Sequence, residues 1–138
     1  AGAWSKLDGV VSRSTGDLTR YLAHAEDVRA ITAAADVLTP VEASCRYVAG
    51  RLFAAEGFSH TEHERRFGAS LPVPLRAELE RLAEAGWATC EGDRWKLTCE
   101  GGHRYDDAVR RLAAAAQAEK EAAGHRGAGA SPRVAASA

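Results

Sequence analysis

Apolar residues recur with helical spacing in the middle of the chain. Four leucines follow one another at intervals of four, four and three residues, which places them on one stripe of an α-helix. They are Leu71, Leu75, Leu79 and Leu82. Gly86 follows the last turn, where a glycine can end a helix in the left-handed conformation. The pattern predicts a helix that begins at Leu71, ends before Gly86 and buries its leucines.

A different pattern follows this helix. Two short runs, residues 87–90 and 95–98, flank Gly92-Asp93, and a glycine first in a two-residue turn favours a type II′ β-hairpin. Side chains alternate faces along a strand, so the register gives one apolar and one polar face. The apolar face carries Ala88, Cys90, Trp95 and Leu97. We therefore predict a hairpin whose apolar face, Cys90 included, belongs to the core.

Helix signals precede this stretch. One helix is expected from Ser14 to about Ala30, followed by an alanine-rich link. Thr39-Pro40-Val41-Glu42 is a capping box that opens a second helix, which we expect to end at Gly57. Its predicted core face consists of Val41, Cys45, Val48, Leu52 and Phe53.

A second capping box, Ser59-His60-Thr61-Glu62, opens a short helix through Phe67 that Gly68 ends. A last helix is expected from about Cys99 to Ala123. The order of helix, short helix, helix, hairpin and helix predicts a mainly α, winged-helix-like domain with one small β-hairpin at about 87–90 and 95–98. We place this domain at residues 14–123, a preceding segment at 1–13, and a disordered tail at 124–138.

Composition narrows the function classes. The chain has 138 residues, 46% hydrophobic and 27% charged, with a formal net charge of -1. A dedicated nucleic-acid binder usually carries a basic excess, which is missing here. There is no run of the ~20 apolar residues that span a bilayer and no recognisable signal peptide, so we expect a cytoplasmic protein without a membrane partner. The chain has no methionine and opens on AGAWS, which suggests a processed protein or a piece of a longer one.

Candidate chemical groups are few. His60 and His63 are three residues apart on a predicted helix and, with Glu64, suggest a metal site, but zinc sites need three or four ligands, and the alternative is an ordinary polar helix. A second polar group is His103, Tyr105 and Asp106, for which the alternative is a solvated first turn with Tyr105 in the core. The cysteines Cys45, Cys90 and Cys99 have neither disulfide-framework nor metal-knuckle spacing. We predict no catalytic residue and no metal ligand.

The helix-then-hairpin order also suggests a DNA-reading module. The Leu71 helix is expected to expose side chains whose charges sum to -1: Arg76, Glu78, Glu80, Arg81 and Glu84. Such a face gains little from the dense negative charge of a duplex. A winged-helix transcription regulator or protein-interaction module is therefore the alternative function, and nucleic acid is an improbable partner.

Several strings in order resemble a known family. These are GAWSKLDG, LTRYL, LTPVEA, RLFAAEGFSHTEHERRFG, ELERLAEAGW and KLTCEGGHRYDD. Together, from Ala1 to Leu112, they resemble the C-terminal region of the oxygen-independent coproporphyrinogen III oxidase/dehydrogenase-like radical S-adenosylmethionine (SAM) family. The sequence departs from the family pattern in two places. The usual "Leu-Arg-Leu-x-x-Gly" arginine becomes Gly50-Arg51-Leu52, with Phe53 and Glu56 before Gly57, and Ser59 stands where Asp is common. These departures fit a divergent member better than the porphyrin-processing branch.

The resemblance implies a parent enzyme with a [4Fe-4S] cluster held by three cysteines, which cleaves SAM to a radical. The cluster motif CxxxCxxC would lie upstream, and no cofactor would be bound by this chain alone. The implied partners are a radical SAM barrel domain, in the same parent chain or as a separate subunit, and through it a small-molecule substrate. This chain would help to close the active site and shape the substrate pocket without catalysing the reaction.

The same resemblance implies that residues 1–13 are the end of a preceding catalytic barrel domain or a linker. Gly2, Ala3, Trp4 and Ser5 would then be the positions nearest to SAM or substrate. For Trp4 two roles are open, a wall of the substrate pocket and a hydrophobic plug between domains.

Overall fold

The chain divides into two units, Ala1–Ala43 (unit 1) and Ser44–Ala138 (unit 2), in a computed structural model that describes residues 2–7 and 9–128. The sequence placed the first boundary after Arg13, and the structure moves it to Ala43. The reason is strand pairing, because residues 4–7 and 10–14 form one sheet with residues 32–37.

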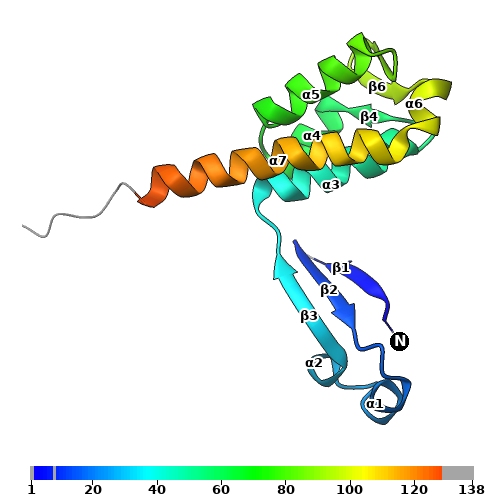
Figure 1. The fold of residues 1–138 in the computed structure, drawn as a ribbon, viewed down its shortest axis with the longest axis vertical. Helices are drawn as coiled ribbons and strands as arrows, with labels where there is room; N and C mark the ends of the chain where they lie inside the picture. Colours follow the sequence, from blue (N-terminus) through cyan, green and yellow to red (C-terminus); the bar gives the residue numbers. More distant parts are fainter. Residues whose placement is uncertain (1, 8, 129–138) are drawn as a thin grey trace, which may run out of the picture. The chain divides into compact units, whose positions relative to one another are not determined.

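Unit 1 is a small antiparallel sheet with two short helices (Figure 1). Its strands lie in the order β1-β2-β3: β1 Trp4–Leu7, β2 Val10–Ser14 and β3 Thr32–Val37. Between β2 and β3 lie α1 (Leu18–Ala23) and α2 (Val28–Ile31). The single helix predicted from Ser14 to Ala30 is therefore wrong, because Asp27 caps a new helix at the amides of Arg29 and Ala30. The predicted alanine-rich link is strand β3.

Unit 2 contains most of the helices. The connecting helix α3 (Pro40–Phe53) begins in the last residues of unit 1. The following elements are β4 Phe58–Ser59, α4 His60–Phe67, α5 Val73–Glu84, β5 Ala88–Glu91, β6 Arg94–Leu97, α6 Cys99–His103 and α7 Tyr105–Ala128. A three-stranded antiparallel sheet joins β4, β6 and β5 in that order. The mainly α class is confirmed, although the β content exceeds the single hairpin that was predicted.

The hairpin has the predicted register. Cys90 pairs with Trp95 and Ala88 with Leu97. Ala88 and Trp95 are buried, but Cys90 is exposed, so its predicted place in the core is wrong. Strand β5 is at the edge of the sheet and Cys90 lies beside the turn, whereas Trp95 is on the central strand β6.

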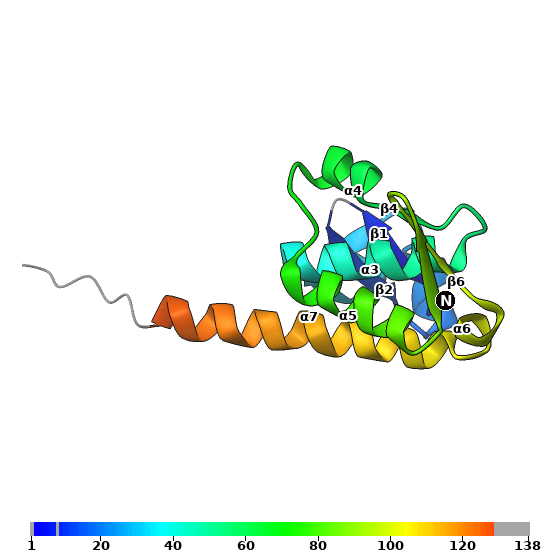
Figure 2. The same ribbon diagram turned by 90° about the horizontal axis from the view of Figure 1, so that it is seen from above.

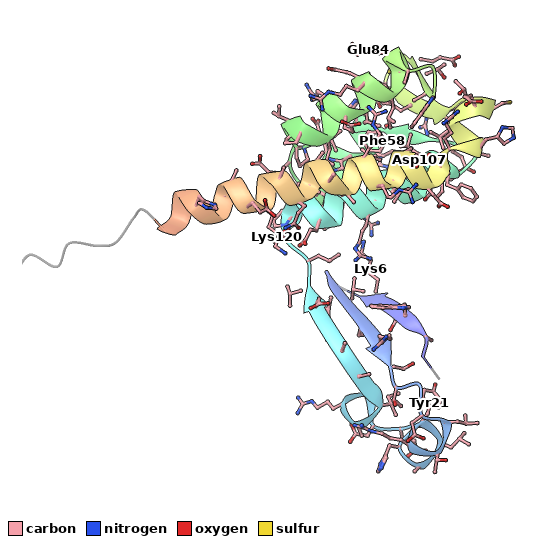
Figure 3. All side chains as sticks on the ribbon, viewed as in Figure 1. Lys6, Tyr21, Phe58, Glu84, Asp107 and Lys120 are labelled. Carbon is pink, nitrogen blue, oxygen red and sulfur yellow. The ribbon has the colours of Figure 1, made fainter. Side chains whose placement is uncertain are left out.

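The core of unit 2 comes from helices far apart in sequence. Helices α5 and α7 lie side by side (Figures 1 and 2). Figure 3 shows Phe58 enclosed by the helices of unit 2, and its side chain is fully buried. All four predicted leucines are buried, together with Val48, Leu52, Phe58 and Leu112. Phe53 was expected there too, but it is 71% exposed. It follows the buried Leu52 by one residue, about 100° further round the helix, and is the last residue of α3, which was expected to continue to Gly57.

Local signals set several helix ends. Thr39 and Glu42 form the predicted reciprocal capping box, with Thr39 N donating to Glu42 Oε2 at 2.8 Å and Glu42 N donating to Thr39 Oγ1 at 3.4 Å. Gly68 ends α4 with a left-handed φ of 67°. Gly57 has a φ of 75°, and a Cβ there would lie 2.2 Å from the Trp95 carbonyl oxygen, so the chain needs glycine for this close approach.

The last predicted helix is interrupted at Arg104, which separates α6 from α7. Helix α7 continues to Ala128, so residues 124–128 of the predicted disordered tail are helical. The rest of that tail, residues 129–138, lies outside the described residues.

Candidate functional site

The sequence-predicted site at Gly2–Ser5 covers the approach to and the start of β1, an edge strand of unit 1. Strand β1 pairs with β2, and Gly2 N donates to the Thr15 carbonyl at 2.7 Å. The Trp4 side chain is 64% exposed, with the Arg13 guanidinium 5.6 Å from its ring centroid. This strand therefore presents a large aromatic surface, and its Ser5 hydroxyl lies 3.1 Å from the Ser12 hydroxyl.

His60 and His63 point to different partners. Trp95 Nε1 donates to His60 Nε2 at 3.0 Å, while His63 Nε2 is 3.0 Å from Ser44 Oγ. His63 is 1% exposed and stacks on Phe67 with ring centroids 4.6 Å apart. The predicted spacing thus does not bring the two rings to a common metal position. Among residues 2–7 and 9–128 we find no group of three or more His, Cys, Asp or Glu side chains suited to a metal ion.

His63 is a buried polar residue in an aromatic environment. Its pKa is lowered mainly by burial, and the neighbouring His60 acts in the same direction. The Ala69 backbone and the Glu64 carboxylate partly offset this effect. Nδ1 makes no hydrogen bond of normal geometry to any described residue. The ring is therefore a neutral packing element of the core.

The hairpin turn caps helix α4. Ser59 Oγ donates to Asp93 Oδ2 at 2.5 Å, and the Thr61 amide donates to the same oxygen at 3.2 Å. Ser59 also accepts from the Glu62 amide at 3.2 Å, as the capping box predicted. These hydrogen bonds, that of Ser59 above all, lower the pKa of Asp93. The sequence indicated only a turn residue at position 93, because its partner is 34 residues away.

One pocket of unit 2 is strongly basic. It has a volume of about 540 Å³ and is lined by Tyr47, Arg51, Glu62, Arg65 and Arg66, a set that we call the arginine pocket. Glu62 is held by Arg94 at 3.0 Å and lies 3.6 Å from Arg51. Sequence reasoning missed this pocket. The available signal was the pair Arg65-Arg66 on a short helix, but the opposite wall comes from α3.

Arg51 is incompletely paired in this pocket. Its Nε atom is buried and has no hydrogen-bond partner within the described part of the chain. A buried donor without a partner costs about 1–3 kcal/mol. An acceptor that enters the pocket and reaches this group would recover that energy.

Glu78 changes the net charge expected on the exposed face of α5, the face that would read DNA. The sequence counted it as exposed, but it is 5% exposed and pairs with Arg111 at 2.5 Å and Arg81 at 2.9 Å. Without Glu78, the charges on the exposed face of α5 cancel rather than summing to -1. The face is still not basic, so the argument against a duplex stands.

The other polar candidates have structural surroundings. Tyr105 is half-buried and its hydroxyl donates to the Ala49 carbonyl at 3.2 Å, whereas His103 and Asp106 are exposed. Burial raises the pKa of Tyr105, and the Asp106 charge adds to this shift. Cys45 is buried, and Cys99, like Cys90, is exposed. Burial and the nearby Asp93 raise the pKa of the Cys90 thiol, which makes it a poor nucleophile.

Comparisons with known proteins point to one fold. No protein-family model matches the chain, and no curated protein matches it. It is similar in structure to coproporphyrinogen III oxidase (HemN) from Escherichia coli, a radical SAM enzyme, with a TM-score of 0.59 and 14% sequence identity. The match covers 80% of this chain and 26% of that chain, so this chain spans about a quarter of the length of HemN. At this identity the similarity shows a HemN-like fold alone.

Within residues 2–7 and 9–128, none of the helices is both long and apolar enough to cross a bilayer.

Proposed function

We propose that this chain is the C-terminal part of a HemN-like radical SAM enzyme and that it helps to close the active site and shape the substrate pocket. The main support is the match of 80% of this chain to only 26% of HemN. The ordered family-like strings from GAWSKLDG to KLTCEGGHRYDD add to this support. The parent enzyme then provides catalysis, and this chain provides a docking unit and a helical domain of winged-helix-like order.

Unit 1 has the surface of a docking element. Five of its large apolar side chains are 60% or more exposed: Trp4, Leu18, Leu22, Val28 and Val37. A segment of 43 residues buries too little surface for a stable core of its own, and clusters of exposed apolar residues mark interaction sites. We assign the radical SAM barrel domain as the occupant of this surface, because about three-quarters of a HemN-like protein is not represented in this chain.

The cysteines of this chain do not fit the cluster of such an enzyme. Cys45, Cys90 and Cys99 are spaced by 45 and 9 residues, unlike CxxxCxxC, and Cys45 is buried. The proposal therefore places the [4Fe-4S] cluster and SAM in the preceding domain. The contribution of this chain is limited to packing, with Trp4 facing either the substrate pocket or the domain interface.

The experiment uses the parent protein, expressed with the coding sequence upstream of Ala1 and reconstituted with iron and sulfide without oxygen. We expect iron–sulfur absorption and release of methionine from SAM under reducing conditions. Trp4→Ala should lower SAM cleavage or substrate turnover, because it removes the largest exposed side chain of β1. Val73→Ala is the matched control, since Val73 is 78% exposed on unit 2.

Two results would overturn this proposal. One is a parent reading frame without CxxxCxxC and without cluster absorption. The other is tight duplex DNA binding by the chain in a gel-shift assay, weakening steeply with salt as phosphate contacts do. The second result would favour the alternative, a winged-helix regulator.

A further inference from the structure

The arginine pocket of unit 2 contains more positive charge than its own acidic residue balances. Arg51, Arg65 and Arg66 face one carboxylate, that of Glu62, which leaves a net charge of +2 on the lining. Arg94 does not add to the free donors, because it already donates to Glu62 at 3.0 Å and to the Glu56 carbonyl at 2.9 Å. The excess charge therefore belongs to the three arginines.

The acidic residues of α4 are bound elsewhere. Glu62 and Arg66 have the i,i+4 spacing that favours a helix ion pair, yet Glu62 contacts Arg94 and Arg51 instead. Glu64, the other nearby carboxylate, accepts from Ser70 Oγ at 2.8 Å. Within the described residues neither Arg65 nor Arg66 forms an ion pair. Two guanidinium groups on the same helix are thus left without a counter-charge.

The wall of the pocket from α3 offers further hydrogen-bond donors, the neutral hydroxyl of Tyr47 and the guanidinium of Arg51. The Tyr47 ring lies under Arg66, with the guanidinium carbon 5.4 Å from the ring centroid. The Tyr47 hydroxyl has no hydrogen-bond partner in the described part of the chain. The buried Nε of Arg51 also lacks one there. Side chains from α3 and α4 thus line one concave space of about 540 Å³, large enough for a small organic anion.

We infer that the arginine pocket binds a small, multiply charged oxyanion. Arginine forks match carboxylate and phosphate groups, to which they donate paired hydrogen bonds. Arg65 and Arg66 supply the uncompensated charge, Tyr47 supplies a hydroxyl donor, and Glu62 holds Arg51 in place. This inference depends on unit 2 alone and is independent of the proposed function.

The test is calorimetric titration of the full chain at constant ionic strength with two probes, citrate for carboxylates and pyrophosphate for phosphates. We expect saturable binding of at least one probe, and the tighter one identifies the chemical class. Arg65→Gln should weaken that binding about tenfold, the loss expected for a charge-assisted hydrogen bond. Arg51→Lys should also weaken it, because lysine keeps the charge but has no Nε donor.

Arg76→Gln is the matched control. Arg76 is exposed on α5 and forms no ion pair among the described residues, and its substitution removes the same single charge as Arg65→Gln. The affinity of the Arg76→Gln variant for the probe should equal that of the unmodified chain. The inference is overturned when neither probe binds saturably up to the millimolar range. It is also overturned when Arg76→Gln weakens binding as much as Arg65→Gln, since the effect is then net charge alone.

Discussion

Gly101 offers a sharp test of how unit 2 packs. It is buried in α6, and a Cβ at this position would lie 1.8 Å from the carbonyl oxygen of Trp87 and 2.7 Å from its carbonyl carbon. The next residue, Gly102, is in the same helix, yet a Cβ there would have no atom within 4 Å. Gly101→Ala and Gly102→Ala are therefore the same chemical change in neighbouring positions with opposite expected effects.

The Trp87 backbone, which a Cβ at position 101 would meet, is held by hydrogen bonds on both sides. The Trp87 carbonyl accepts from the Thr98 amide at 3.0 Å, and the Trp87 amide donates to the Leu82 carbonyl at 2.8 Å. Relieving the clash needs a shift of more than about 1 Å, since real Cβ contacts stay beyond 3.0 Å. Overpacking costs about 1–3 kcal/mol and a lost hydrogen bond about 1 kcal/mol, against a helix-propensity gain of about 1 kcal/mol. The last two terms offset each other, so we expect Gly101→Ala to lower the free energy of unfolding by about 1–3 kcal/mol.

Urea unfolding followed by tryptophan fluorescence measures this difference. In a Trp4→Phe background the signal comes from Trp87 and Trp95, which both lie in unit 2. Gly102→Ala should raise the free energy of unfolding by roughly 0.5–1 kcal/mol, the usual gain for an exposed helical glycine. Equal unfolding midpoints for Gly101→Ala and the unmodified chain would refute the packing of α6 against the Trp87 carbonyl.

Three further predictions concern the core and its titrating groups. Because the pKa of His63 is lowered in the folded state, the unfolded state binds the proton more readily below about pH 6.5. The free energy of unfolding should therefore decrease as pH falls below this value, by up to about 1.4 kcal/mol per pH unit. His63→Phe should flatten this part of the stability profile. Leu79→Ala should cost about 2–5 kcal/mol in urea unfolding, whereas the exposed Val73→Ala should change stability by less than about 0.5 kcal/mol. Because the pKa of Asp93 is lowered in the folded state, its carboxylate stabilises the fold above its ordinary pKa of about 4, and this stabilisation is lost as pH falls through the folded pKa. Thermal unfolding of Asp93→Asn should therefore depend less on acid pH. Equal acid sensitivity of the variant and the unmodified chain would contradict the Ser59 contact.

Short-range patterns predicted much of unit 2. The leucine stripe, the capping boxes at Thr39 and Ser59, and the hairpin register all depend on residues within a few positions of one another. Such signals are encoded in propensity and periodicity and do not need knowledge of a partner element. The exception was Phe53, the last residue of α3, which was placed in the core but is exposed because it lies one residue beyond the buried Leu52.

Strand β3 shows where such patterns stop being informative. Its residues, TAAADV, include three alanines, which have no marked apolar alternation. The strand forms because β2 offers a pairing edge earlier in the chain, with Val10 opposite Val37, 27 residues away. Pairing over this distance is a property of the folded sheet, so the sequence indicated only a link at these positions.

Side-chain burial was the property that the sequence patterns predicted least well. Cys90 and Trp95 occupy one face of the hairpin, yet only Trp95 is buried, because no further strand follows β5 at the edge of the sheet. Glu78 was assigned to the exposed face of α5, but Arg111 on α7 reaches it from 33 residues away. The arginine pocket likewise needs α3 and α4 to meet.

Helix and hairpin positions were thus set by the order of residues along the chain, since they result from local backbone preferences and side-chain period. The unit boundary, the sheet of unit 1, the buried Glu78 and the arginine pocket were decided only by tertiary structure. These features depend on which surfaces pack together, and packing energy comes from contacts between residues far apart in sequence. The charges that define the arginine pocket are visible in the sequence, but their lack of counter-charges follows from the fold, which directs Glu62 and Glu64 to other partners.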